Sequence, residues 1–250
     1  MTKLLRRKLF IALILTFVLA AILVWQTAIV EIMALARFDA HTEIPFIALS
    51  FDDGPDLGEE QLLQALNDAR IRVTFFWTLE KIQSMQQSYP EEFNNIVKLI
   101  NQGGHEIGIH GYQCHLSWNP IERFFILNED ENIEYLKNQY RDIFNTEPKL
   151  YRSHGPRSGR SFYSSLKESD VELAFGSVQY QIGVQGDVKK YIDYTSEAEA
   201  GKIICGHDSR NCELDSGMPE NITGIIHEIK QIIREREISI VTISELFETQ

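Results

Sequence analysis

The chain has 250 residues, 44% of them hydrophobic and 24% charged, which suits one medium-sized domain with an appendage. Its formal net charge of −12 argues against the nucleic-acid backbone as a partner, because no basic stripe is present to displace the counterions of that backbone. The same charge would repel polyanionic substrates, so a neutral or cationic ligand is favoured.

The three cysteines, Cys114, Cys205 and Cys212, are an odd number and too few for a disulfide framework. Cys205 and Cys212 could pair in an oxidising compartment. Unpaired thiols are the alternative.

The N-terminal segment predicts a membrane anchor. Basic residues between Lys3 and Lys8 precede an unbroken apolar run over residues 9–25, and apolar character resumes as far as Met33. This length approaches the roughly 20 residues that span a bilayer and exceeds the core of a signal peptide. Because a basic flank stays in the cytoplasm, we expect residues 1–38 to be a cytoplasmic tip, a retained signal anchor and a stalk, with residues 39–250 periplasmic or extracellular. Cleavage at the small-residue pattern of residues 34–36 is the alternative.

From about residue 43 the sequence predicts strands that alternate with helices. Residues 45–51 form an apolar run that ends at a turn-forming cluster, and apolar positions at helical spacing follow over residues 59–69. Residues 71–77 are rich in β-branched and aromatic side chains, as strands are. The remaining expected strands are 105–109, 149–152, 171–175, 202–205 and 239–242, and the remaining expected helices are 91–101, 129–144, 161–167 and 222–236.

This alternation predicts an α/β fold with a mainly parallel sheet and right-handed crossovers, either open or closed into a barrel. In such folds functional residues gather at the carboxyl ends of the strands. Asp52 and Asp53 follow the first expected strand, His110 the third, Arg152 the fourth and His207 the sixth.

Two adjacent carboxylates, Asp52 and Asp53, repel each other unless a cation or a division of protonation roles offsets the repulsion. Their alternative role is that of an acidic turn before a helix, whose N-terminus favours negative charge. His110 and His115 lie in one short loop and could converge on a cation, because neutral imidazole is a common zinc ligand. With one carboxylate they would form a three-ligand site that leaves a position open for water.

Three further polar residues have open roles. His105 is separated from His110 by a strand-like segment, so we interpret it as structural. His207 could protonate a leaving group or simply cap a strand. Arg152 could hold a catalytic carboxylate by a bidentate pair or form a structural ion pair.

Taken in order, these clusters resemble the motifs of the polysaccharide deacetylase family of carbohydrate esterases. Residues 50–55 (Ser-Phe-Asp-Asp-Gly-Pro) resemble the first motif, residues 104–110 the second and residues 201–208 the last. Residues 73–76 resemble the strand that follows the first motif, and residues 241–246 resemble the final strand and helix. The resemblance therefore covers about residues 44–247. It implies a distorted (β/α) barrel of about seven strands.

The resemblance also implies an activity: metal-dependent removal of N-acetyl groups from a glycan that contains N-acetylglucosamine, chitin-like or peptidoglycan-like. Asp53, His110 and His115 would bind a divalent metal, commonly zinc. Asp52 would be the base that activates water, and Arg152 would orient it. His207 would protonate the departing amine, and a backbone N–H near His154 or Gly155 would help to stabilise the oxyanion.

The chain departs from the family pattern at three places. The family's two metal histidines normally stand four residues apart, but His110 and His115 are five apart; either the loop bulges, which we favour, or Cys114 takes the place of His115. Residues 152–155 read Arg-Ser-His-Gly where Arg-Pro-Pro-Tyr-Gly is usual. Gln179 or Gln181 stands where the family often has an aspartate that tunes the catalytic residues. These departures keep two alternatives open: a catalytically weak glycan-binding or envelope-assembly protein, and a deacylase of another N-acyl compound.

Overall fold

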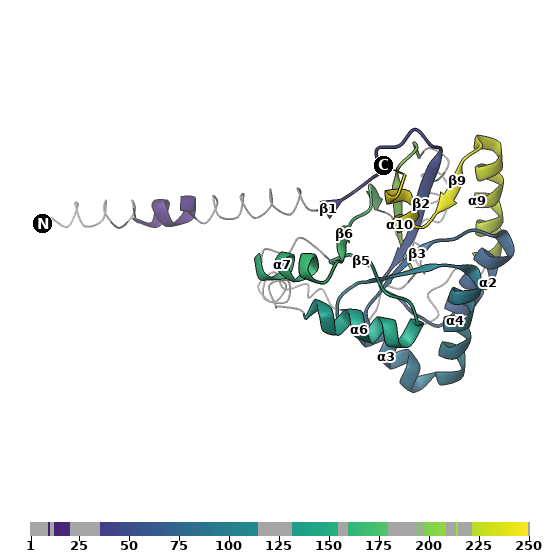
Figure 1. Cartoon of the computed structure of the whole chain (residues 1–250), viewed down its shortest axis with the longest axis horizontal. Helices are drawn as coiled ribbons and strands as arrows, with labels where there is room; N and C mark the ends of the chain where they lie inside the picture. The colour runs from purple at the N-terminus through teal and green to yellow at the C-terminus, as the bar shows by residue number, and fades with distance from the viewer. Residues whose placement is uncertain are drawn as a thin grey trace, which may run out of the picture.

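A parallel β-sheet with helices packed outside it forms the centre of the molecule (Figure 1). This computed structural model describes residues 10, 13–20, 36–114, 132–154, 160–179, 195, 198–208, 214 and 222–249. The strands are β1 (Ala36–Arg37), β2 (Phe46–Asp52), β3 (Thr74–Trp77), β4 (Glu106–Ile109), β5 (Leu150–Tyr151), β6 (Glu172–Ala174), β7 (Val178–Gln179), β8 (Ile203–His207) and β9 (Ser239–Val241). The helices are α2 (Glu59–Ala69), α3 (Leu79–Ser88), α4 (Pro90–Gly103), α6 (Ile133–Phe144), α7 (Arg160–Glu168), α9 (Ile222–Arg236) and α10 (Ile243–Phe247).

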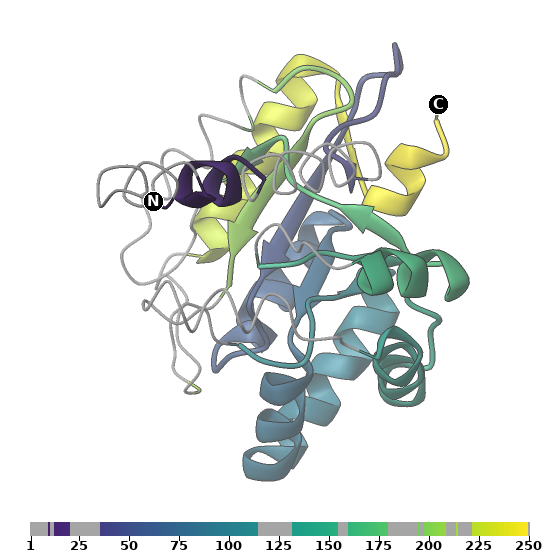
Figure 2. The same ribbon diagram turned by 90° about the vertical axis from the view of Figure 1, so that its left-hand side faces the viewer.

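The sheet is curled. Its strand order is β1-β6-β5-β4-β3-β2-β8-β7, with β9 also paired to β2, and all these strand pairs are parallel. Figure 2 shows β2 beside β8. Strands β6 and β7 lie near opposite ends of this order, yet only residues 175–177 separate them along the chain. Because one residue spans at most about 3.3–3.6 Å, the two ends of the sheet must lie close together, consistent with the expected distorted barrel.

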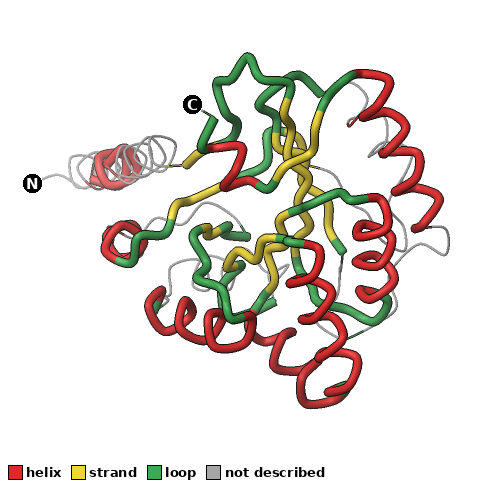
Figure 3. The backbone as a smooth tube through the Cα atoms, turned by 45° about the vertical axis from the view of Figure 1, so that its right-hand side comes forward, coloured by secondary structure: helices red, strands yellow, loops and turns green. Residues whose placement is uncertain are grey.

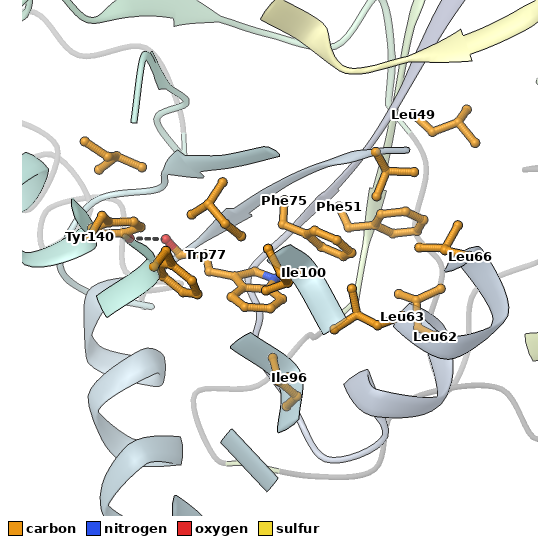
Figure 4. Packing of buried hydrophobic residues seen from close by; sticks show 14 of the residues in the cluster. Leu49, Phe51, Leu62, Leu63, Leu66, Phe75, Trp77, Ile96, Ile100 and Tyr140 are labelled. Carbon is orange, nitrogen blue, oxygen red and sulfur yellow. Dashed lines mark hydrogen bonds between the residues drawn. The ribbon is translucent and has the colours of Figure 1, made fainter. Parts of the chain in front are cut away.

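The larger hydrophobic core lies between the sheet and helices α2, α4 and α9, which Figure 3 shows on the outside of the strands. Apolar residues of α2 at helical spacing, among them Leu62 and Leu66, pack against Phe51 of β2 and Phe75 of β3 (Figure 4). Burial of each such side chain contributes about 1.5–3 kcal/mol. This packing fixes the strands whose carboxyl ends carry the polar clusters.

The sequence predicted most long elements, but it missed helix α3. The side chain of Lys81 in this helix is fully buried and pairs with Asp56, with 2.9 Å between Nζ and Oδ2. A buried lysine interrupts the apolar pattern by which a helix face is recognised. The two-residue strands β1 and β7 were also not predicted, and the expected start of a helix at residues 129–131 lies outside the described residues.

The expected N-terminal anchor falls largely outside the described residues. Residues 13–20 are helical and their apolar side chains are exposed, Phe17 to 77%. Within the described part of the chain, no helix is both long enough and apolar enough to cross a membrane. Strand β1 pairs with β6, so the sheet includes two residues that precede the expected domain boundary at residue 39.

Candidate active site

Polar side chains meet at the carboxyl ends of strands β5, β4, β2 and β8, with β3 lying between β4 and β2 in the sheet, as the alternating pattern predicts. Asp52 is the last residue of β2 and Asp53 follows it; His110 follows β4, Arg152 and His154 follow β5, and His207 is the last residue of β8.

The carboxylate of Asp52 forms a buried ion pair with Arg152. Nη1 of Arg152 donates to Oδ1 of Asp52 at 2.6 Å and to Oγ of Ser50 at 2.8 Å. Nε of Arg152 donates to the carbonyl of Ala174 at 3.1 Å, and the guanidinium lies over the ring of Phe76, 4.0 Å from its centroid. The side chains of Arg152 and Asp52 are only 1% and 6% exposed. A buried pair of this kind is tolerated because further hydrogen bonds, here from Nη1 and Nε of Arg152, help to offset the loss of hydration.

The second oxygen of Asp52 has a different partner. Sγ of Cys205 donates to Oδ2 of Asp52 at 3.2 Å, and Cys205 is fully buried. Burial, together with the negative charge of Asp52, raises the pKa of this thiol well above its ordinary value, so Cys205 is a neutral donor. Both oxygens of Asp52 are therefore held in place by residues behind the site.

The turn after β2 is held in place by contacts with Asp208 and Trp77. The backbone N–H of Asp208 donates to the carbonyl of Asp52 at 3.2 Å, and Nε1 of Trp77 donates to Oδ2 of Asp208 at 2.7 Å. A Cβ on Gly54 would collide with the Trp77 indole and the Asp208 carboxylate, so only glycine fits there. Asp53 adopts a φ of 75°, a left-handed conformation that aspartate tolerates better than most residues. The turn therefore presents the Asp53 carboxylate to the site.

Three side chains converge around Asp53. Nε2 of His110 lies 3.2 Å from Oδ1 of Asp53, and Nδ1 of His154 lies 3.4 Å from the same oxygen. Asp53, His110 and His154 each have one potential ligand atom, and these three atoms all lie within 4.8 Å of one another. Nε2 of His207 is 3.9 Å from Oδ2, the other oxygen of Asp53. The Asp53 carboxylate thus faces His110 and His154 through one oxygen and His207 through the other.

The pKa values of these groups depend on one another. Burial alone would raise the pKa of Asp53, but its hydrogen bond to His110 and the charges of the three histidines lower it below its ordinary value. Burial would lower the pKa of His110, but the carboxylates of Asp52 and Asp53 raise it. Burial and the nearby His110 lower the pKa of His154 to about 4, so His154 is neutral at neutral pH.

Two imidazoles and one carboxylate are the donor set of catalytic zinc sites that keep a position open for water. The convergence of Asp53, His110 and His154 fits such an ion. The expected ligand His115 lies outside the described residues, so its assignment stays a prediction. Gln181 and the side chain of Gln179 also lie outside the described part of the chain, although the backbone of Gln179 belongs to β7. Their place in the family pattern therefore stays a prediction.

The structure excludes two of the alternatives that the sequence left open for the cysteines. Cys205 is a free thiol, so it does not pair with Cys212; it is buried in the middle of β8, against Asp52 and Arg152. Cys114 is disulfide-bonded to a partner outside the described residues, which excludes it as a thiolate ligand while the bond is intact.

The sequence interpretation missed the side chain of His154. It had considered only a backbone N–H near this residue, as an oxyanion donor. The available signal was a histidine directly after a strand, in a motif where the family usually has no histidine. His105, by contrast, is structural as expected: its Nδ1 accepts from the backbone N–H of Val73 at 3.2 Å, and its Nε2 lies 3.0 Å from Oδ1 of Asn67.

Comparison with known proteins identifies the family to which the chain belongs. Residues 39–174 match the family model for polysaccharide deacetylase. The chain is 30% identical over 216 residues to a peptidoglycan-N-acetylglucosamine deacetylase of Bacillus cereus, a match that covers 81% of this chain and 68% of that protein.

Solved structures show the same fold. The crystal structure of a peptidoglycan N-acetylglucosamine deacetylase superposes with a TM-score of 0.62 at 20% identity, covering 86% of this chain and 94% of that one. A CE4-family pseudoenzyme from Bacillus anthracis superposes with a TM-score of 0.60 at 11% identity, covering 86% and 69%. Because the fold alone is shared by an enzyme and a pseudoenzyme, the assignment depends on the family match and the site residues. The chain belongs to the polysaccharide deacetylase family and is a hydrolase that acts on carbon–nitrogen bonds other than peptide bonds.

Proposed function

We propose that this chain is a metal-dependent deacetylase that removes N-acetyl groups from a glycan containing N-acetylglucosamine, either chitin-like or peptidoglycan-like. The observation that carries the proposal is the pairing of Asp52 with Arg152 beside the convergent Asp53 and His110, with His207 facing them. The similar protein of Bacillus cereus is named for its action on peptidoglycan N-acetylglucosamine.

Each side chain has a distinct role in this proposal. Asp53 and His110 help to hold a divalent cation, which we expect to be zinc. Such an ion, when bound, lowers the pKa of a coordinated water and polarises a carbonyl oxygen. Asp52 acts as the general base for the attacking water, and Arg152 holds its carboxylate in one orientation through the 2.6 Å bond.

His207 acts as the general acid that protonates the departing sugar amine. Its position supports this role: it ends the strand next to β2, and its side chain is 23% exposed, so a substrate can reach it. The side chain of Asp52 is only 6% exposed by contrast. The base is therefore enclosed by protein, and the acid faces solvent where the leaving group would lie.

Acetate release by the full chain on a panel of substrates tests the proposal. The panel contains N-acetylated chitooligosaccharides, peptidoglycan and small N-acyl compounds. We expect acetate from a glycan and a large loss in the Asp52→Asn and His207→Ala variants. Glycan binding without acetate release would favour the glycan-binding alternative, and release from small N-acyl compounds alone would favour the other deacylase.

We also propose that the N-terminal segment anchors the chain in the cytoplasmic membrane with the catalytic domain outside. The basic flank of an apolar run, the exposed apolar side chains of residues 13–20 and the disulfide at Cys114 support this arrangement, because disulfides persist in oxidising compartments. We expect the chain to sediment with membranes and to be degraded by protease added outside the cytoplasmic membrane. Recovery in the soluble fraction would contradict the proposal.

A further inference from the structure

We propose that the third ligand of the metal is His154, which follows β5, and that it replaces His115 in this role. The inference rests on the proposed metal-dependent function and concerns the same site. It assigns to residues 152–155, which stand where the family usually has Arg-Pro-Pro-Tyr-Gly, a ligand that the family resemblance placed in the loop after β4.

The hydrogen bond of His154 determines which of its nitrogens can bind a metal. Nε2 of His154 lies 3.0 Å from the carbonyl oxygen of Gln113. A carbonyl only accepts, so Nε2 must carry the hydrogen and donate it. In the neutral ring Nδ1 then has a free lone pair, and Nδ1 is the atom that lies 3.4 Å from Oδ1 of Asp53.

His110 has the complementary arrangement. Its Nδ1 lies 2.6 Å from the carbonyl oxygen of Arg152 and therefore donates to it. Its Nε2 is the atom that faces Asp53, at 3.2 Å. Histidines that ligate metals almost always donate their other ring N–H to a carbonyl, a carboxylate or water, which fixes the tautomer and the ring orientation. Both histidines meet this requirement through backbone carbonyls.

The three ligand atoms also need a cation. With both rings neutral, two nitrogen lone pairs and one carboxylate oxygen face one another, and acceptors at these distances repel unless positive charge lies between them. A single proton can bridge one nitrogen to Asp53 and leaves the other nitrogen without a donor. A divalent ion can accept all three lone pairs at once.

Residues 111–114, which follow His110 at the end of β4, support the site through their backbone. Gly111 and Tyr112 accept backbone hydrogen bonds from Leu79 and Glu80 at the start of α3, at 3.1 and 2.9 Å. The backbone N–H of Cys114 donates to Oε2 of Glu80 at 3.1 Å, and Cys114 is disulfide-bonded. The carbonyl of the neighbouring Gln113 is therefore fixed where it orients His154.

Two departures from the family pattern then have one explanation. The spacing of His110 and His115 is one residue longer than the family pattern, and residues 152–155 contain a histidine where that pattern has none. The gain at His154 compensates for the change in the loop, because the strand end of β5 lies beside that of β4.

Metal binding, measured without substrate, tests the proposal. The full-length chain is depleted of metal, then titrated with Co²⁺ while its visible absorption is followed, and Zn²⁺ affinity is measured by competition. We expect His154→Ala to weaken binding by more than about 100-fold, beyond the roughly 10–100-fold typical for loss of a partner that only orients a ligand. The matched variant His115→Ala should stay within about threefold of the unsubstituted chain, since it removes no ligand.

A third variant keeps a ligand at the same place. A carboxylate oxygen of aspartate stands as many bonds from Cα as Nδ1 of histidine, so His154→Asp should bind Co²⁺ more tightly than His154→Ala and with a shifted spectrum. Circular dichroism of each metal-free variant checks that it is folded.

Binding by folded His154→Ala within about threefold of the unsubstituted chain would overturn the proposal, as would loss of binding in His115→Ala with retention in His154→Ala. The result is separate from the enzymatic proposal. A chain that binds Co²⁺ through His154 but releases no acetate from any glycan would leave the ligand assignment intact and refute the deacetylase function.

Discussion

The substitution Arg152→Met would leave Asp52 as a buried carboxylate without its ion-pair partner. The two side chains are 1% and 6% exposed and their charged atoms are 2.6 Å apart, so water cannot take the place of the guanidinium. Removal of one partner of such a buried pair costs about 3–5 kcal/mol. Because methionine fills much of the volume of the arginine stem, most of this cost comes from the lost charge. We therefore expect the free energy of unfolding, measured by urea denaturation of the metal-depleted chain, to fall by about 3–5 kcal/mol.

The double variant Arg152→Met/Asp52→Asn is the matched control. It removes the buried negative charge as well, so it should be more stable than Arg152→Met alone, although the hydrogen bonds from Arg152 to Ser50 and Ala174 stay lost. Both variants should release no acetate. A loss of less than about 1 kcal/mol in the single variant, or a double variant no more stable than the single one, would refute the reasoning.

Three further predictions concern residues around the site. Burial lowers the pKa of His105 from 6.5 to about 4, so its contribution to stability is complete above pH 6.5 and is lost as the pH falls towards 4, by about 3 kcal/mol in all. In His105→Asn the free energy of unfolding, measured with urea, should therefore depend less on pH between 6.5 and 4. Equal pH dependence in the variant and the unsubstituted chain would contradict this. Cys205→Ala removes a donor to Asp52 and should lower kcat about 2- to 10-fold with KM unchanged, whereas Cys205→Ser should retain more activity; equal kcat values in all three forms would show that the thiol has no such role. A Cβ at Gly108 would collide with the ring of Phe76, so Gly108→Ala should destabilise the fold by about 1–3 kcal/mol in thermal unfolding; an unchanged melting temperature would show that the ring yields freely.

The sequence predicted those elements whose burial follows a regular period. Helices α2 and α9 were expected at residues 59–69 and 222–236, where the structure has them, because apolar side chains recur at helical spacing. Helix α3 was missed because Lys81 points into the interior towards Asp56, a pairing between distant residues that no local pattern reveals. Strands β1 and β7 are two residues long and exist only through their sheet neighbours.

The candidate site shows the same division. Asp52, Asp53, His110 and His207 could be identified because each directly follows or ends an apolar strand, and parallel strands place their carboxyl ends together. His154 could not be proposed as a ligand from the sequence, because that requires knowing which nitrogen faces Asp53 and which faces Gln113. The disulfide of Cys114 was missed for a related reason: pairing depends on Cα distances and side-chain directions that spacing along the chain does not give.

The most direct test of the proposed function is the release of acetate and free amine from N-acetylated chitooligosaccharides and peptidoglycan by the full-length chain. We expect equal amounts of acetate and amine from the metal-loaded chain, almost none after chelation, and recovery when the metal is restored. Asp52→Asn should stay inactive in all three states, because its site lacks the general base. No release from any of these glycans by a folded, metal-loaded chain that still binds them would contradict the deacetylase function.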